Sequence, residues 1–217
     1  MPIRARRKSR ARPTFKEERS LRAEGYSLLA GLDEVGRGPL AGPVMAGVAI
    51  LPDRLKGRWV KLVRDSKQMT AAQRDYVLPY LQDVALALEV GASSPEEIDS
   101  LGIVAATRLA MQRALDSVTL LPQFLLLDAI TLPQVSIPQK AIIRGDSLCI
   151  SISAASIVAK VTRDNLMKAE DEMYPGYGFA QHKGYGTPGH MRSLERLGPC
   201  AIHRHSFAPI NGRTGAC

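Results

Sequence analysis

The chain has 217 residues, of which 45% are hydrophobic and 23% charged, a composition that excludes a wholly disordered protein. It contains only three cysteines, Cys149, Cys200 and Cys217, so a disulfide-stapled scaffold is excluded and a reducing, cytoplasmic compartment is expected. No apolar run is long enough to span a bilayer and no secretory signal is visible, so we expect no membrane partner.

The net charge of +8 is concentrated at the amino-terminal end. Residues 1–26 hold nine Lys or Arg and three Glu, whereas residues 27–217 hold twenty Lys or Arg and eighteen Asp or Glu. The first 16 residues contain no acid, which suits a polyanionic partner because each neutralised phosphate releases condensed counterions. A solvated tail without a ligand and a transit peptide are the alternatives. We therefore expect a basic, disordered tail over 1–26 and one folded domain over 27–217.

Hydrophobic periodicity and turn residues predict the elements of this domain. In chain order they are strands over 27–35 and 43–51, a helix over 70–85 with Thr70 as its N-cap, a strand over 85–93, a short helix with Ser94 as its N-cap, a helix over 102–118, strands over 124–130 and 141–147, and helices over 151–174 and 188–198. The first two strands are separated by too few residues for a helix, so they form a hairpin. This order predicts an α/β domain with a mixed sheet covered by helices.

Carboxylates close three of the predicted strands: Asp33 and Glu34 the first, Asp128 the fourth and Asp146 the fifth. A single acid at a strand end is more often a helix cap, but three such ends can bring four carboxylates into one small volume. Like charges at that distance repel one another unless a cation neutralises them. Oxygen ligands without His or Cys favour Mg²⁺ or Mn²⁺, and two such ions suit in-line attack at a phosphodiester.

A glycine-rich segment, Gly36-Arg37-Gly38, directly follows the first pair of acids. Glycine allows a close approach of the backbone to a ligand, and an arginine pairs with phosphate. The segment also matches the G-x-G-x-x-A pattern of dinucleotide-binding proteins, but that motif must open a helix. Here a second strand follows at once, so we exclude a dinucleotide site.

The long helix carries a polar stripe formed by Ser153, Ser156, Lys160 and Asp164. A solvated helix face is the simple interpretation of such a stripe. The small residues around Ser156 favour close packing instead, and the stripe begins seven residues after Asp146. We expect it to support that acid from behind.

Two further groups lie towards the carboxyl end. Lys183 and Tyr185 lie in a glycine-containing loop, where the lysine can meet phosphate and the tyrosine can stack on a sugar or base. Cys200, His203 and His205 are metal-ligand residue types, but no fourth ligand is evident and we favour a structural role for them.

Taken together, these blocks resemble the bacterial ribonuclease HII family over about residues 27–210, with every block in order. The segments that carry the resemblance are 33–38, 42–44, 65–67, Asp128, 145–146, 154–164 and 182–185. The resemblance implies an RNase H-like α/β fold with a mixed five-stranded sheet, and a type 2 catalytic domain over 27–217. It also implies a metal-dependent endonuclease that cleaves RNA in RNA–DNA hybrids and at single ribonucleotides embedded in duplex DNA, leaving 3′-OH and 5′-phosphate ends.

The same resemblance assigns roles to individual residues. The metal-binding, catalytic carboxylates are Asp33, Glu34, Asp128 and Asp146. The substrate-binding residues are Gly36, Arg37, Gly38 and Tyr185, which match the group that recognises the ribose 2′-OH, together with Lys67 and Lys183. We expect a monomer that uses Mn²⁺ or Mg²⁺. The alternatives are another nuclease of the same fold, such as a junction resolvase, and a non-catalytic nucleic-acid-binding module.

Overall fold

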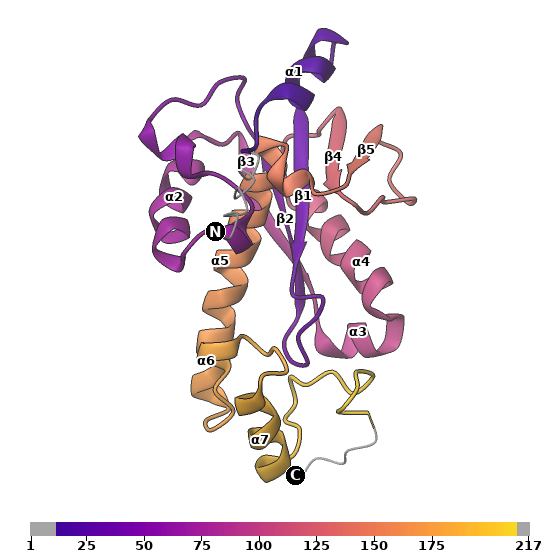
Figure 1. Ribbon diagram of the computed structural model, residues 1–217. Helices are drawn as coiled ribbons and strands as arrows, with labels where there is room; N and C mark the ends of the chain where they lie inside the picture. The colour runs from indigo at the N-terminus through magenta and orange to yellow at the C-terminus, as the bar shows by residue number, and fades with distance from the viewer. Residues whose placement is uncertain (1–11, 212–217) are drawn as a thin grey trace, which may run out of the picture.

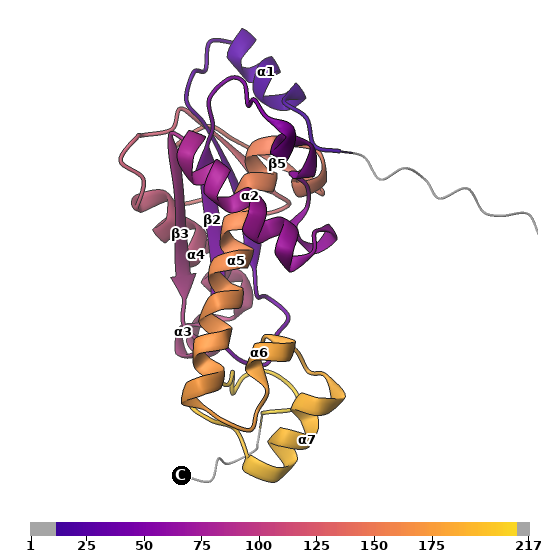
Figure 2. The same cartoon turned by 90° about the vertical axis from the view of Figure 1, so that its left-hand side faces the viewer.

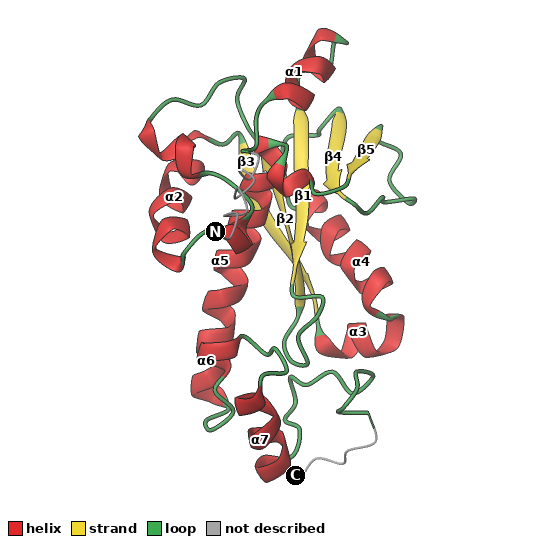
Figure 3. Cartoon of the chain, in the orientation of Figure 1, coloured by secondary structure: helices red, strands yellow, loops and turns green. Residues whose placement is uncertain are grey.

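The computed structural model describes residues 12–211, which form a twisted five-stranded sheet with helices on both faces (Figures 1 and 3). The strands are β1 (Leu29–Val35), β2 (Val44–Ile50), β3 (Ala87–Ser93), β4 (Phe124–Asp128) and β5 (Gln139–Ile142). The α-helices are α1 (Lys16–Ala23), α2 (Ala71–Val84), α3 (Pro95–Leu101), α4 (Ile103–Asp116), α5 (Ile150–Met173), α6 (Phe179–His182) and α7 (Pro188–Leu197). Short 3₁₀ helices are η1 (Arg58–Leu62), η2 (Ser66–Gln68) and η3 (Gly145–Ser147). Within residues 12–211, no helix is both long and apolar enough to cross a membrane.

The strand order is β3-β2-β1-β4-β5, so the predicted mixed five-stranded sheet is confirmed. β1 and β2 form the predicted antiparallel hairpin, and β3 extends it, also antiparallel. β4 and β5 add in parallel on the other side of β1. Leu32 of β1 pairs with Leu127 of β4. The residues that follow them, Asp33 and Asp128, therefore lie side by side towards the carboxyl ends of these two strands.

Each face of the sheet has its own hydrophobic core. Alternate residues of β1, such as Ala30 and Leu32, pack against α4 on one face. On the other face α5 lies across β1 and β2, with α2 beside it (Figures 1 and 2). α5 lies very close to β1, because a Cβ at Gly31 would be 2.2 Å from the main-chain carbon of Ser151. The start of the long helix is thereby fixed directly over the strand that carries Asp33.

The predicted helix boundaries that rest on capping residues are confirmed. Thr70 accepts a hydrogen bond from the Gln73 main-chain N–H and forms a complete capping box before α2. Ser94 and Glu97 form the second box, before α3. Caps are local, so the sequence alone is enough to place them.

The prediction of a disordered tail over 1–26 is wrong for its second half, because residues 16–23 form α1. Leu21 packs against Leu29, and the buried Glu18 carboxylate accepts hydrogen bonds from the main-chain N–H (3.0 Å) and hydroxyl (2.8 Å) of Ser151. The N-cap residue of α5, Cys149, makes no capping hydrogen bond with its side chain, so Glu18 of α1 caps the long helix instead. Residues 1–11 lie outside the described part of the chain.

The basic run joins the fold beside a pocket. The Thr14 main-chain N–H donates to the Leu148 carbonyl at 2.9 Å, and Leu148 lines the pocket that contains Asp146. We expect removal of residues 1–11, with their five Lys or Arg, to flatten the slope of log K against log salt for duplex binding, by about 0.9 for each phosphate that these residues neutralise. Salt titrations by fluorescence anisotropy measure this slope. The truncation leaves Thr14 and α1 in place, so kcat at saturating substrate should not change, and an unaltered slope would contradict the prediction.

The strand predicted over 141–147 is also wrong in its second half. β5 ends at Ile142, and Asp146 lies in η3 rather than at a strand end. The break occurs at Arg144, whose φ of 59° is left-handed, after which the Gly145 main-chain N–H donates to the Asp128 carboxylate at 2.9 Å. A carboxylate on the neighbouring strand therefore redirects the chain before α5 begins.

Candidate active site

Three of the four predicted carboxylates meet at the edge of the sheet. One oxygen each from Asp33, Asp128 and Asp146 lie within 4.8 Å of one another. Asp33 comes from β1, Asp128 from the neighbouring parallel strand β4, and Asp146 from the turn before α5. The fold thus brings together groups that are separated by up to 113 residues along the chain (146 − 33).

Glu34 lies next to the cluster but faces differently from Asp33, as neighbouring residues of a strand must. One of its carboxylate oxygens is 3.4 Å from an Arg37 guanidinium nitrogen, and its main-chain N–H donates to the Asp33 carboxylate at 2.8 Å. The second oxygen of Glu34 and the second oxygen of Asp33 are buried and have no hydrogen-bond partner among the described residues.

The pKa values of Asp33, Glu34 and Asp146 are raised, because these carboxylates are buried and like charges lie close to them. Burial raises the pKa of Asp33 well above its usual range, and the Glu34 charge raises it further, against a lowering by the Ser156 hydroxyl. Burial likewise raises the pKa of Glu34. The pKa of Asp146 rises to about 6, through burial first and then the nearby charges of Asp65 and Asp128.

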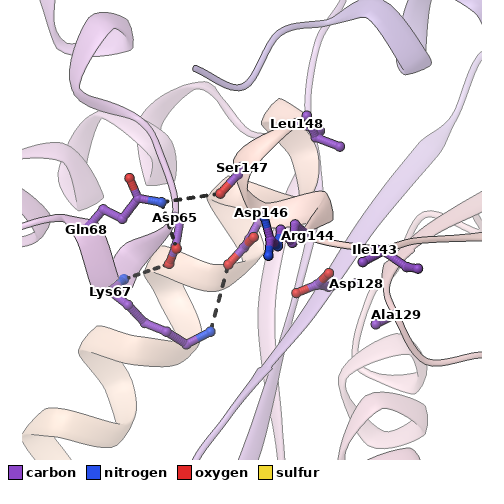
Figure 4. A pocket seen from close by; sticks show the side chains of 10 residues that line it. All are labelled: Asp65, Lys67, Gln68, Asp128, Ala129, Ile143, Arg144, Asp146, Ser147 and Leu148. Atoms are coloured by element: carbon purple, nitrogen blue, oxygen red, sulfur yellow. Dashed lines mark hydrogen bonds and ion pairs between the residues drawn. The ribbon is translucent and has the colours of Figure 1, made fainter. Parts of the chain in front are cut away.

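A pocket of about 900 Å³ opens over Asp128 and Asp146 (Figure 4). Lys67 extends into it from η2, with its ammonium nitrogen 3.8 Å from an Asp146 oxygen and its side chain 61% exposed. Burial lowers the pKa of Lys67, but the carboxylates, Asp33 first, outweigh it and leave that pKa raised. The lysine is therefore a charged group at the rim of the acidic cluster.

Asp65 and Arg144 also line this pocket, and sequence reasoning did not single out either of them as a functional side chain. Asp65 caps η2 by accepting from the Lys67 main-chain N–H at 2.9 Å, and it also accepts from the Gln68 side chain at 3.0 Å. An Asp one residue before Ser-Lys is a recognisable N-cap signal. No comparable signal exists for Arg144, because its position depends on the left-handed turn.

The polar stripe of α5 supports the site, as predicted, but through the main chain of Asp146. The Ser153 hydroxyl donates to the Asp146 carbonyl at 2.5 Å. The Ser156 hydroxyl lies 2.8 Å from that of Ser66, next to Lys67. Further along the stripe Lys160 and Asp164 form an ion pair at 2.6 Å. The first two serines therefore fix the turns that carry Asp146 and Lys67.

The glycine-rich loop and Tyr185 come together, although 147 residues separate them in sequence (185 − 38). A Cβ built on Gly38 would be 3.8 Å from ring carbon Cε1 of Tyr185. The Leu40 main-chain N–H donates to the Gly184 carbonyl at 2.8 Å, and the Arg204 N–H donates to the Leu40 carbonyl at 2.9 Å. Figures 1 and 2 show the carboxyl-terminal segment lying against this β1–β2 connection.

Lys183 does not join the carboxylate pocket. Its ammonium group donates to the Ala180 carbonyl, and it lines a separate pocket of about 290 Å³ with Lys160 and Lys168 of α5. Burial lowers the pKa of Lys183. The loop predicted around it contains the one-turn helix α6.

The carboxyl-terminal histidines form a buried hydrogen-bonded chain. The Cys200 main-chain N–H donates to Nδ1 of His203 at 2.9 Å, and the Nε2 atoms of His203 and His190 are 3.0 Å apart. Nδ1 of His190 lies 3.0 Å from the Tyr185 carbonyl, which only accepts, so this nitrogen carries the proton. His203 must then donate to His190, and both rings are neutral. Cys200 and His203 therefore have the structural role that the sequence favoured, whereas His205 is exposed and lies outside this hydrogen-bonded chain.

Acid should disrupt this chain. Burial first, and then the neighbouring His190, lower the pKa of His203 to about 4 from an ordinary value of 6.5. The unfolded chain binds a proton below pH 6.5 that the folded chain refuses until about pH 4, so the free energy of unfolding should fall by about 3 kcal/mol across that window. Urea unfolding between pH 7 and 4 should show a shallower loss for His203→Gln than for the unaltered chain. The exposed His205→Gln is the control, and equal slopes for the His203 variant and the unaltered chain would refute the assignment.

The donor set fits a divalent cation. The cluster and the adjacent Glu34 offer only carboxylate oxygens, and one oxygen of Asp33 and one of Glu34 are buried without a hydrogen-bond partner among the described residues. Such crowding of negative charge is unfavourable without a counter-charge. An RNase H-like sheet that presents such a cluster beside a glycine-rich loop defines a class of protein, the metal-dependent nucleases of this fold.

Comparison with known proteins identifies the member of that class. The family model described as Ribonuclease HII matches residues 30–210. Ribonuclease HII of Dehalococcoides mccartyi is 52% identical over 200 residues, covering 92% of this chain and 94% of the relative. Ribonuclease HII of Geotalea uraniireducens is 47% identical, with 92% and 91% covered. The crystal structure of ribonuclease H2 from Pyrococcus horikoshii OT3 has a TM-score of 0.68 at 27% identity, covering 84% of this chain and 95% of that one.

The chain belongs to the ribonuclease HII family. It is a ribonuclease H, an endonuclease of a family that depends on a divalent metal.

Proposed function

We propose that the protein cleaves the RNA strand of RNA–DNA hybrids, and DNA duplexes at single embedded ribonucleotides, leaving 3′-OH and 5′-phosphate ends. One observation carries the proposal: the Asp33, Asp128 and Asp146 oxygens lie within 4.8 Å of one another, on a chain that also places Tyr185 where a Cβ on Gly38 would be 3.8 Å from its ring. The cluster suits phosphodiester hydrolysis, and the loop suits recognition of a ribose. Residues 27–217 are proposed as the type 2 catalytic domain.

We assign the carboxylates Asp33, Glu34, Asp128 and Asp146 as ligands of Mg²⁺ or Mn²⁺. Bound there, such a cation supplies Lewis-acid polarisation of a phosphodiester and of the attacking water. The protein's part is positioning. The Gly145 N–H orients Asp128, the Glu34 N–H orients Asp33, and Ser153 fixes the turn of Asp146.

Recognition of the ribose is assigned to the loop Gly36-Arg37-Gly38 and to Tyr185. The 2′-OH both donates and accepts hydrogen bonds, so main-chain groups of the loop and the tyrosine hydroxyl are suitable partners. Tyr185 is 44% exposed, which leaves room for the neighbouring sugar beside it.

Lys67 and Lys183 are proposed to contact phosphates at different places. Lys67 is charged and largely exposed at the carboxylate pocket, so it suits the phosphate next to the scissile bond. Lys183, with Lys160 and Lys168, borders the second pocket and suits a phosphate further along the duplex. All the groups proposed for the site come from one chain, so a monomer is sufficient for activity. The small number of cysteines, which are free, favours the cytoplasm as the compartment of the protein.

The decisive experiment uses an end-labelled DNA duplex with one embedded ribonucleotide, incubated with Mg²⁺, with Mn²⁺ or with a chelator. We expect metal-dependent cleavage on the 5′ side of the ribonucleotide, and no cleavage of the all-DNA duplex of the same sequence. Binding without cleavage would indicate a nucleic-acid-binding module. Preference for an all-DNA four-way junction would indicate a resolvase.

A further inference from the structure

Two arginine side chains are buried behind the β1–β2 connection, residues 36–43. Arg163 of α5 and Arg204 near the carboxyl end each have 0% exposed surface. Within residues 12–211 neither forms an ion pair with a carboxylate. Burial lowers the pKa of Arg163 to about 10 and that of Arg204 to about 9, and the charge of Arg163 contributes to the latter. Burying two cations without a counter-ion costs desolvation free energy. Neutral side chains could hold an ordinary loop without that cost, so we expect a functional reason for these two arginines.

Arg204 donates its hydrogen bonds to main-chain carbonyls of the connection. Its Nη2 donates to the Gly36 carbonyl at 2.6 Å, its Nη1 to the Arg37 carbonyl at 3.0 Å, and its Nε to the Gly42 carbonyl at 2.9 Å. A planar guanidinium fixes the directions of these donors, so three points of the loop are held in one rigid arrangement.

Arg163 joins the same connection to the segment that carries Tyr185. Its Nε donates to the Pro43 carbonyl at 2.9 Å and its Nη2 to the Ala41 carbonyl at 3.1 Å. Its Nη1 donates to the Lys183 carbonyl at 3.0 Å, two residues before Tyr185. A single buried side chain therefore determines how the loop and the tyrosine lie relative to each other.

The loop sequence accommodates this arrangement. Gly36 has a φ of 91°, and a Cβ there would be 2.3 Å from Nε of Arg163. Any other residue would displace the guanidinium. The carbonyls of Gly36 and Arg37 are occupied by Arg204, whereas the main-chain N–H groups of Arg37 and Gly38 donate no hydrogen bond within residues 12–211. The loop thus retains donors for a ligand beside the tyrosine ring.

We propose that Arg163 and Arg204 are positioning residues for ribonucleotide recognition, which hold the carbonyls of residues 36–43 inward and so direct the remaining N–H donors to the ribose beside Tyr185. The inference rests on the proposed role of the loop and Tyr185 in binding the ribose. It adds two residues that need not contact the substrate. The directions of their guanidinium donors, more than their charge, determine how well a ribonucleotide is distinguished from a deoxyribonucleotide.

The test compares two substitutions of Arg204 on two substrates. Arg204→Lys keeps the charge and loses the forked donors, whereas Arg204→Gln loses the charge. For Arg204→Lys we expect kcat/KM on the duplex with one ribonucleotide to fall about 10- to 100-fold, and on a continuous RNA–DNA hybrid much less. Combined with Tyr185→Phe, the losses should be less than additive, because both changes weaken one contact. Arg22→Lys, a sheltered arginine that donates to the Leu51 carbonyl, is the matched control and should leave both values unchanged.

Several outcomes overturn the proposal. If Arg204→Lys lowers kcat/KM equally on both substrates, Arg204 has a structural role only. If Arg204→Lys leaves kcat/KM nearly unchanged while Arg204→Gln lowers it, only the charge of Arg204 matters and not the geometry of its donors. If Tyr185→Ala leaves the substrate preference unchanged, the proposed role of Tyr185 fails and this inference falls with it. If Tyr185→Ala changes the preference and Arg204→Lys does not, only this inference fails.

A second measurement needs no substitution at either arginine, in case those variants do not fold. The Asp128→Asn protein is used because it should bind the duplex without cleaving it. In this protein, the ¹⁵N NMR signals of the Arg163 and Arg204 Nε–H groups should shift when a duplex with one ribonucleotide is added. An all-DNA duplex of the same sequence should shift them less, because it lacks the 2′-OH that the loop binds. Identical shifts with the two duplexes would overturn the proposal.

Discussion

Asp33→Asn and Asp128→Asn should each abolish cleavage. Each removes the charge of one member of the carboxylate cluster, so the loss should exceed the about 10- to 100-fold typical of residues that only support a metal ligand. Activity is measured as kcat/KM on the duplex with one ribonucleotide, in saturating Mg²⁺ and in Mn²⁺. The exposed Asp83→Asn is the matched control, and it should cleave normally.

Stability separates this result from unfolding. Without metal, both variants should be as stable as the unaltered protein or more so, because burial and like charges already disfavour the ionised cluster. Added Mg²⁺ or Mn²⁺ should raise the melting temperature of the unaltered protein and raise that of the variants less, since a ligand that binds the folded state more tightly stabilises it more. Near-normal cleavage by Asp128→Asn would show that the metal site lies elsewhere.

Tyr185→Ala should weaken cleavage at a single ribonucleotide more than cleavage within a long RNA stretch. In the proposed complex with a single ribonucleotide, the neighbouring sugar is a deoxyribose that packs on the Tyr185 ring, and a single 2′-OH supplies the polar contact. A site built around such a contact rejects the analogue that lacks it far better than an apolar pocket does. Tyr185→Phe, which keeps the ring and loses the hydroxyl, should fall between Tyr185→Ala and the unaltered protein.

The measurement is kcat/KM for both variants on both substrates. Tyr76→Phe, a change of an exposed tyrosine on α2, is a suitable control because it makes the same chemical change elsewhere. Equal losses on the two substrates would mean that Tyr185 has a structural role and that the junction is recognised by other groups.

Local signals in the sequence were sufficient for much of the fold. The hairpin, the caps at Thr70 and Ser94 and the long helix depend on neighbouring residues, and these predictions are confirmed. Two errors have non-local causes. The turn at Asp146 depends on a hydrogen bond from the Gly145 main-chain N–H to the carboxylate of Asp128, 17 residues earlier, and α1 is held by contacts of Glu18 and Leu21 with distant elements.

The candidate site shows the same division. The carboxylates were recognisable because acids that end apolar runs are unusual, and three of them do meet. The roles of Arg163 and Arg204 could not be recognised in the sequence, because arginine is ordinarily a surface residue and nothing in the local sequence shows that these two are buried. The pairing of Gly38 with Tyr185 was expected only from the resemblance to a family, since it joins segments that no local pattern links.

The hydrogen bond between Arg204 and the Gly36 carbonyl spans 168 residues, which has a consequence for synthesis of the protein. A ribosome delivers residues 36–43 long before Arg204, so this loop stays unsupported until residue 204 has been synthesised. The nascent chain can form its hairpin and α2 long before it has a complete site. Such dependence on distant contacts also slows folding. The enzyme is therefore expected to become competent only once Arg204 has left the ribosomal tunnel, and any premature stop before residue 204 should yield an inactive fragment.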